Sequence, residues 1–153
     1  MEEKLDKLYN EIANRVVSII PSKWEKIYFM GEVEKEKKSW NFIFYFLDED
    51  NKFQRAYDIP ELYKVSEEIF DNLMEEVEEA LLKIYDCFVE NNQECWTRMV
   101  FKLSKSGKFT IDFSYNNEFD KFGPAERETL WAYKTFGYVP KSKFLRAFLE
   151  NRN

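Results

Sequence analysis

The chain has 153 residues, of which 44% are hydrophobic, 34% are charged and 18% are aromatic. This composition excludes a disordered chain and predicts a globular fold that buries its core without disulfides or metals. The net charge is −6, and the best basic cluster, at 35–38, is interleaved with glutamates, so direct binding to nucleic acid is disfavoured.

Features of a membrane or secreted protein are not found in the sequence. No segment approaches the roughly 20 apolar residues that a membrane-spanning helix needs. Residues 1–12 are charged and periodic and lack the apolar centre of a signal peptide. We therefore expect a cytoplasmic protein without membrane contact, in which Cys87 and Cys95 are reduced and packed.

The first part of the chain predicts one helix and then three strands. Apolar residues recur every three or four positions over residues 2–20, which is the pattern of an amphipathic helix, and Pro21 ends it. Strand-like runs follow at 24–33, 39–48 and 52–59. The second run is apolar on both faces, which predicts a strand covered on each side.

A long helix is predicted over 66–91, where the side chain of Ser66 can cap the free amide groups. Its predicted buried stripe consists of Ile69, Leu73, Val77, Ala80, Leu81, Ile84 and Phe88. Seven acidic residues with no basic residue among them lie near its start: Glu67, Glu68, Asp71, Glu75, Glu76, Glu78 and Glu79. They form either a solvated face or an acidic surface that docks on a basic partner, such as the phosphate-binding cleft of a nuclease.

A hairpin and two helices close the chain. Apolar residues alternate strictly at 95–103 and 108–115 around a Ser-Gly turn, and helices are expected at 125–137 and 141–151. The order α-βββ-α-ββ-α(α) predicts a single α+β domain over residues 1–153, with an antiparallel sheet of about five strands flanked by helices. Three large aromatic residues are assigned to its core: Trp96, Trp131 and Tyr133.

Little in the sequence indicates catalysis. The chain contains no histidine and only four glycines, none in a phosphate-binding loop, and its cysteines lack the spacing of a zinc site. No cofactor and no metal are therefore expected. One alternative stays open: Asp112 and Glu126 can pair, or can hold a divalent ion with Asp120, as in a small carboxylate-dependent enzyme or a metal-binding protein.

Several short segments, taken in order, resemble one protein family. They are WEKIY at 24–28, YDIP at 57–60, VSEEIF at 65–70, QECWT at 93–97, GKFTIDFSY at 107–115, and Arg127 with WAYKTFG at 131–137. Together they resemble the YezG-like immunity proteins, antitoxins of secreted polymorphic toxins in Gram-positive bacteria. The resemblance implies a protein that is not an enzyme. It implies binding to the C-terminal toxic domain, often a nuclease, of an LXG-type toxin until that toxin leaves by type VII secretion.

Such a function requires surface residues that contact the toxin. The expected contacts are Glu67, Glu68, Asp71, Glu75, Glu78, Glu79, Asp112, Tyr115, Glu118 and Asp120. The tyrosine is included because aromatic residues are frequent hot spots of interfaces. A housekeeping adaptor without a toxin partner is a third interpretation, which a neighbouring gene for an LXG-type toxin would argue against.

Overall fold

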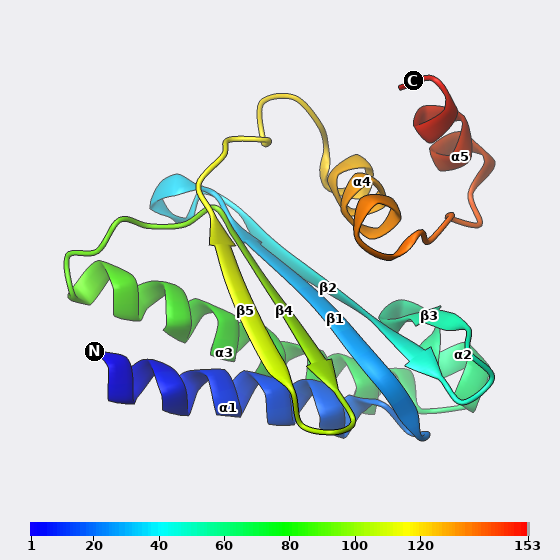
Figure 1. Cartoon of the computed structure of the whole chain (residues 1–153), viewed down its shortest axis with the longest axis horizontal. Coiled ribbons are helices and arrows are strands. Elements are labelled where there is room, and N and C mark those ends of the chain that lie inside the picture. Colours follow the sequence, from blue (N-terminus) through cyan, green and yellow to red (C-terminus); the bar gives the residue numbers. More distant parts are fainter. Residues whose placement is uncertain (153) are drawn as a thin grey trace. The chain divides into compact units, whose positions relative to one another are not determined.

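The computed structural model describes residues 1–152, and the chain divides into two compact units, Met1–Tyr115 and Asn116–Asn153 (Figure 1). The elements of the first unit are α1 (Glu2–Ile19), β1 (Trp24–Val33), β2 (Trp40–Asp48), β3 (Phe53–Arg55), α2 (Ile59–Tyr63), α3 (Glu67–Glu90), β4 (Arg98–Ser104) and β5 (Phe109–Ser114). Those of the second are α4 (Pro124–Phe136) and α5 (Lys143–Glu150). A single domain over residues 1–153 therefore stays a prediction.

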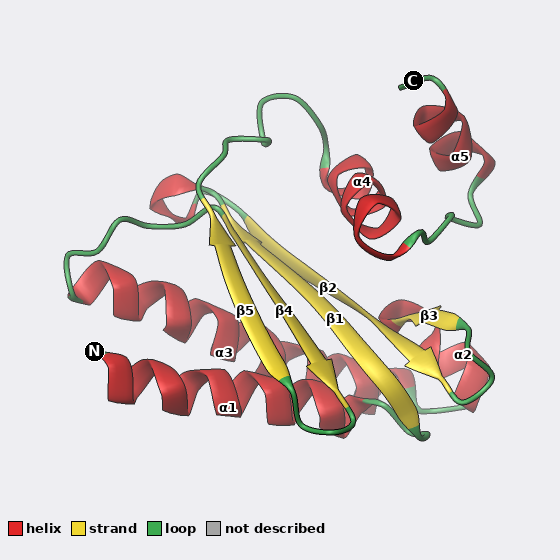
Figure 2. Ribbon diagram, in the orientation of Figure 1, coloured by secondary structure: helices red, strands yellow, loops and turns green. Residues whose placement is uncertain are grey.

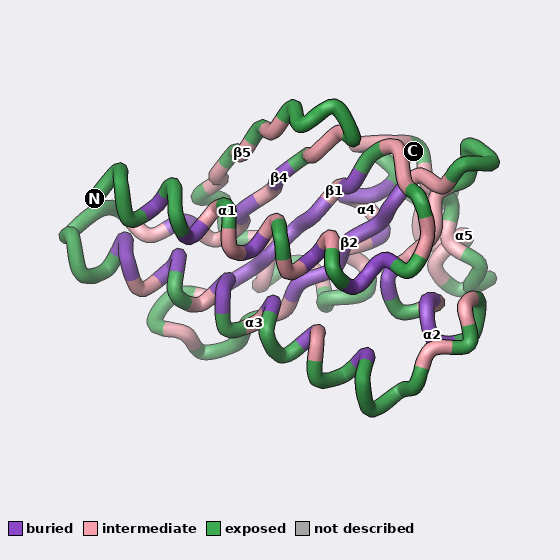
Figure 3. Tube along the Cα trace, turned by 90° about the horizontal axis from the view of Figure 1, so that it is seen from below, coloured by how far each residue is buried: buried purple, intermediate pink, exposed green. Residues whose placement is uncertain are grey.

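The strands of the first unit form one antiparallel sheet in the order β3-β2-β1-β4-β5 (Figure 2). α1 and α3 run side by side along one face of this sheet, as the views in Figures 1 and 3 both show. The predicted α+β class, with an antiparallel sheet of five strands and flanking helices, is confirmed. Among the described residues, no helix is both long and apolar enough to cross a membrane.

The core lies between the sheet and these two helices. At Gly31, in the central strand, α3 approaches the sheet closely. A Cβ atom at this position would lie 2.6 Å from Cδ1 of Leu81 in α3, so the absence of a side chain allows the helix to approach. On the same face, the ring centroid of Phe29 lies 4.7 Å from that of Phe101 and 5.8 Å from that of Phe42. The many phenylalanines therefore fill the space between helices and sheet.

Trp96 enters this core from the segment before β4. It is 1% exposed, as predicted, and its ring lies 5.3 Å from Tyr85 and 5.5 Å from Phe113 between centroids. Its indole Nε1 has no hydrogen-bond partner among the described residues. β4 begins at Arg98, three residues later than predicted, because the chain turns Trp96 inward before strand pairing starts.

The opposite face of the sheet is also buried over the middle of β2 and the second half of β1. Residues 42–46 of β2 are all buried, which confirms the prediction of a strand covered on both sides. On this face Glu32 is 1% exposed, and its Oε2 accepts a hydrogen bond of 2.9 Å from Nη2 of Arg98, directly across the ladder. The ion pair keeps a buried carboxylate matched with a positive charge.

The prediction of a third strand at 52–59 is confirmed for its first half and wrong for its second half. β3 ends at Arg55, a 3-10 turn follows at Ala56–Asp58, and α2 then begins. Pro60 is the physical reason, because it has no N–H to donate to a strand and is well accommodated in the first turn of a helix.

The buried stripe of α3 is wrong in its first two turns and confirmed from its third turn onward. Ile69 and Leu73 were expected inside, but Ile69 is 57% exposed and Leu73 is half-buried. Phe70 and Met74 take their places, with exposures of 2% and 7%. The ring of Phe70 lies 6.0 Å from that of Tyr57 between centroids, and this tertiary contact selects the face that is buried.

In the second unit, α4 ends at Phe136 and is capped by Gly137, whose φ of +74° is in the left-handed region that favours glycine. Trp131 is 6% exposed, as predicted, whereas Tyr133 is 49% exposed, so its assignment to the core is wrong. Residues two positions apart lie about 200° apart around a helix, so Trp131 and Tyr133 cannot both face the core. Arg127, also buried, donates from Nη1 to the carbonyl of Phe122 at 2.6 Å.

Candidate partner-binding surfaces

The acidic face of α3 turns outward from the sheet. It consists of Glu67, Glu68, Asp71, Glu75, Glu76, Glu78 and Glu79, all exposed except Glu78, which is half-buried (Figure 3). The helix begins with the predicted cap, because the N–H of Ile69 donates to Oγ of Ser66 at 3.4 Å. Glu67 and Glu68 lie in the first turn, where the helix dipole stabilises negative charge.

Positive charge from Arg15 compensates only part of this acidic face. Nη1 of Arg15 in α1 lies 3.8 Å from Oε2 of Glu79 and also donates to the main-chain carbonyl of Glu76. Nη2 of Arg15 pairs with Glu11 at 2.6 Å. Among the described residues, no lysine or arginine forms an ion pair with the other carboxylates of the face. Uncompensated negative charge is therefore concentrated in the first turns of α3.

Apolar side chains lie exposed at the same end of α3. Ile69 is 57% exposed, Leu62 at the end of α2 is 48% exposed, and Tyr57 is 49% exposed. Of these three residues, Tyr57 is of a type that is enriched in interface hot spots. The sequence pattern places Ile69 in the core, so this residue is not among the expected contacts. The exposures of Phe70 and Met74 show that the buried stripe is offset by one residue.

The remaining predicted contacts are distributed over both units. Asp112 is exposed on β5, as expected for the polar face of that strand, and Tyr115 is 47% exposed at the end of the first unit. Glu118 and Asp120 lie together in a turn of the second unit, where Oδ2 of Asp120 accepts a hydrogen bond of 2.9 Å from Asn117. The role of these residues in binding a partner stays a prediction.

The geometry gives little support to the alternative of a carboxylate-dependent enzyme or a metal-binding protein. Oε1 of Glu126 accepts a hydrogen bond of 3.3 Å from the N–H of Gly123 and so caps the first turn of α4. Within residues 1–152, no group of three or more histidine, cysteine, aspartate or glutamate side chains is placed to hold a metal ion. Glu126 therefore has a structural role at the start of a helix.

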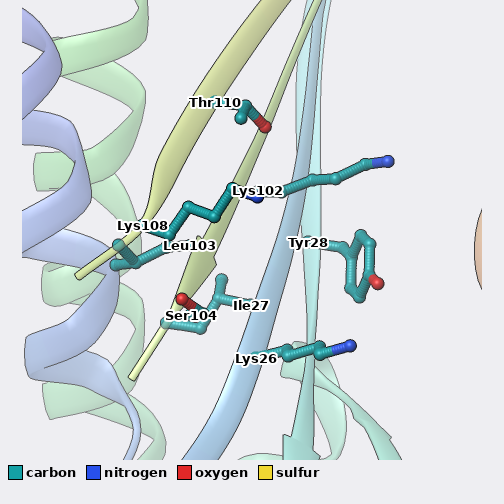
Figure 4. A pocket seen from close by; sticks show the side chains of 8 residues that line it. All are labelled: Lys26, Ile27, Tyr28, Lys102, Leu103, Ser104, Lys108 and Thr110. Atoms are coloured by element: carbon teal, nitrogen blue, oxygen red, sulfur yellow. The ribbon is translucent and has the colours of Figure 1, made fainter. Parts of the chain in front are cut away.

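A groove on the opposite face of the sheet was not found from the sequence. It has a volume of about 330 Å³ and is lined by Lys26, Ile27, Tyr28, Lys102, Leu103, Ser104, Lys108 and Thr110. We call it the lysine groove. Figure 4 shows Lys26, Tyr28 and Lys102 projecting to the side away from α1 and α3. Nζ of Lys102 lies 5.6 Å from the centroid of the Tyr28 ring, within the range of a cation–π contact.

Strand register brings the lysine groove together. Lys26 is opposite Ser104, Tyr28 is opposite Lys102, and Lys102 is in turn opposite Thr110. Residues that pair across antiparallel strands share a face, so these side chains form a row across β1, β4 and β5. Lys26 is far from Lys102 and Lys108 in the sequence, and no local motif links it to them.

The structure is that of an α+β protein with an acidic face on one side of its sheet and a groove of lysines on the other. Exposed charged surfaces of this kind suit electrostatic contact with another protein.

Comparison with known proteins identifies the family. A family model described as "Immunity protein YezG-like" matches residues 5–150. Immunity protein YezG of Bacillus spizizenii is 36% identical over 149 residues, covering 97% of this chain and 92% of that protein. The type VII secretion system protein EsaG of Staphylococcus aureus is 32% identical over 147 residues, covering 94% and 88%. Immunity protein YezG of Bacillus subtilis is 32% identical over 150 residues, covering 95% and 96%.

The chain belongs to the YezG-like family of immunity proteins. Its role is that of an immunity protein, which acts by binding a cognate toxin and is not an enzyme. This identification accords with the resemblance that the short sequence segments indicate.

Proposed function

We propose that this protein acts in the cytoplasm of the producing cell, where it neutralises the C-terminal nuclease domain of a cognate LXG-type toxin until type VII secretion exports it. The name of the Staphylococcus aureus relative, a type VII secretion system protein, supports the export route. The acidic face of α3 is the surface that we assign to the toxin.

The observation that carries the proposal is the uncompensated charge at the start of α3, beside exposed Ile69. A nuclease must present positive charge to the phosphates of its substrate. An acidic surface attracts such a cleft, accelerates association and aligns the two proteins, while an apolar side chain within it contributes affinity once water is excluded.

Charge reversal at the start of α3 tests this proposal. The variant Glu68→Lys, Asp71→Lys, Glu75→Lys changes exposed carboxylates that form no ion pair among the described residues. We expect the association rate with the purified toxin domain to fall about tenfold at low salt, because electrostatic steering is lost. Stopped-flow fluorescence over a range of ionic strengths measures this rate, and the salt dependence should weaken in parallel.

A matched control reverses exposed charges in the first turns of the other long helix: Glu2→Lys, Glu3→Lys, Asp6→Lys in α1. It changes net charge by the same amount at a similar position in a helix. Equal slowing in both variants would assign the effect to net charge alone. If the wild-type protein neither binds the toxin domain nor inhibits its nuclease activity, the proposed function is wrong.

A further inference from the structure

The lysine groove is a second charged surface that the acidic face does not explain. It lies on the sheet face that α1 and α3 leave free, and it reaches from the central strand β1 to the edge strand β5. We propose that it receives an extended acidic segment of the toxin, whose carboxylates contact Lys26, Lys102 and Lys108. This inference rests on the proposed function, because it names the second contact with the same partner.

The positive charge of the lysine groove is unmatched within the described part of the first unit. None of Lys26, Lys102 and Lys108 forms an ion pair there, and no acidic side chain lines the groove. The neighbouring Lys105 shows the contrast, because its Nζ lies 2.8 Å from Oε1 of Glu25. In a chain with a net charge of −6, three exposed lysines without an acidic partner are a feature that an external anion can satisfy.

The arrangement suits several carboxylates better than one phosphate group. No arginine lines the groove, so the bidentate geometry that phosphate favours is missing. The amide groups of β1 and β4 are engaged in ladders on both sides and cannot form a phosphate-binding nest. The lysines supply separate point charges: Lys26 lies in β1, Lys102 in β4, and Lys108 in the turn just before β5. The three strands together span about 10 Å.

An extended peptide matches this spacing. Alternate residues of a strand-like segment lie about 7 Å apart, so acidic side chains at positions i and i+2 can meet two lysines at once. The Tyr28 ring provides an apolar surface beneath the chain, and the hydroxyl group of Thr110 can bond to its main chain. Because β5 is the edge of the sheet, a segment of a toxin bound elsewhere can enter the groove from that side.

Two contacts of opposite sign restrict how a partner can dock. A partner must present basic surface to α3 and acidic side chains to the groove, so a toxin with the reverse distribution is repelled at both places. The lysine groove would therefore contribute to choosing the cognate toxin among related ones.

The test compares two double charge reversals by titration calorimetry with the purified toxin domain. Lys102→Glu with Lys108→Glu changes the groove, whereas Lys35→Glu with Lys38→Glu changes exposed lysines between β1 and β2 by the same charge. We expect affinity to fall at least about tenfold for the groove variant and less than about twofold for the control. Thermal melting verifies that both variants fold. Equal affinity of the groove variant and the wild type would overturn the inference while leaving the proposed function intact.

A second measurement does not depend on the toxin. A hexaglutamate peptide, titrated into the ¹⁵N-labelled protein, should shift amide signals of residues 26–28, 102–104 and 108–110, and the groove variant should abolish the shifts. Inorganic phosphate in the same titration should shift them less. No response to the peptide, a stronger response to phosphate, or shifts that appear with increasing protein concentration alone would each overturn the inference. If the peptide binds but the toxin domain does not, the proposed function fails and the carboxylate specificity of the groove remains.

Discussion

At the scale of single residues, Gly31 determines how closely α3 approaches the sheet. Glycine is unfavourable in a strand interior because it loses more chain entropy than other residues on folding. Here the helix occupies the space that a side chain would take, since Leu81, itself 0% exposed, fills it. Close packing between the helix and the sheet at this contact offsets the entropic cost of glycine in the strand.

Substitution of Gly31 by Ala should therefore destabilise the protein, by about 1–3 kcal/mol, because the added methyl group overpacks a closed core. Leu81→Val in the same chain shortens the opposing side chain, and the double variant should lose less stability than the sum of the single variants. Urea denaturation of the four proteins measures the coupling free energy. Additive losses would show that the approach of the two elements is not limited by this contact.

At the scale of elements, the turn between β2 and β3 is held by one carboxylate. Oδ1 of Asp48 accepts hydrogen bonds from the N–H groups of Asp50 and Lys52 at 2.9 and 3.0 Å, and Oδ2 accepts one from Nε2 of Gln54 at 2.9 Å. Partial burial acts to raise the pKa of Asp48, but these hydrogen bonds outweigh it and lower the pKa below its ordinary value.

This lowered pKa predicts a pH-dependent contribution to stability. Because the folded-state pKa lies below the unfolded-state value of about 3.9, the contribution is present above pH 4 and is lost as pH falls through the folded-state pKa. Asp48→Asn should cost about 1 kcal/mol at neutral pH, allowing for solvent screening. Urea denaturation at pH 7 and pH 3 should show the difference from wild type shrinking at the lower pH. A difference that is equal at both pH values would contradict this account of the turn.

The bounds of the helices and strands also show which sequence patterns were sufficient to locate an element. β1 was predicted with its observed bounds, and α1 and α3 to within a residue at each end, because periodicity and end signals such as Pro21 and Ser66 agree there. The short α2 was missed, since five residues carry too little periodicity to distinguish a helix turn from the end of a strand. Tertiary packing, and not helix propensity, decided that Phe70 and not Ile69 is buried.

At the scale of the whole molecule, the sequence predicts one domain, whereas the contacts within the structure form two compact units. If the chain is a single cooperative domain, all probes should report one unfolding transition. Trp131 reports on the second unit, whereas Trp24, Trp40 and Trp96 belong to the first. Single-tryptophan variants allow each unit to be followed separately.

We expect the Trp96-only and Trp131-only variants to unfold at the same urea concentration, coincident with the loss of helical circular dichroism. This expectation follows from the single domain that the order of the elements predicts, because one domain of this size unfolds cooperatively. A Trp131 transition at clearly lower urea would instead show that residues 116–153 open independently.

The sequence by itself determined the fold class, the order of the longer elements, the acidic composition of α3 and the lack of a catalytic motif, because all of these depend on local periodicity and residue type. It also carried the family resemblance, which the comparisons confirm. The tertiary structure decided which carboxylates of α3 are matched by Arg15 and which apolar residue of its first turn is exposed. It alone brought Lys26 beside Lys102 and Lys108, since strand register places β1 next to the hairpin of β4 and β5, which is far along the chain. The sequence shows how many charged residues a segment carries. Whether those charges are paired on the surface depends on contacts between different helices and strands, which only the folded chain provides.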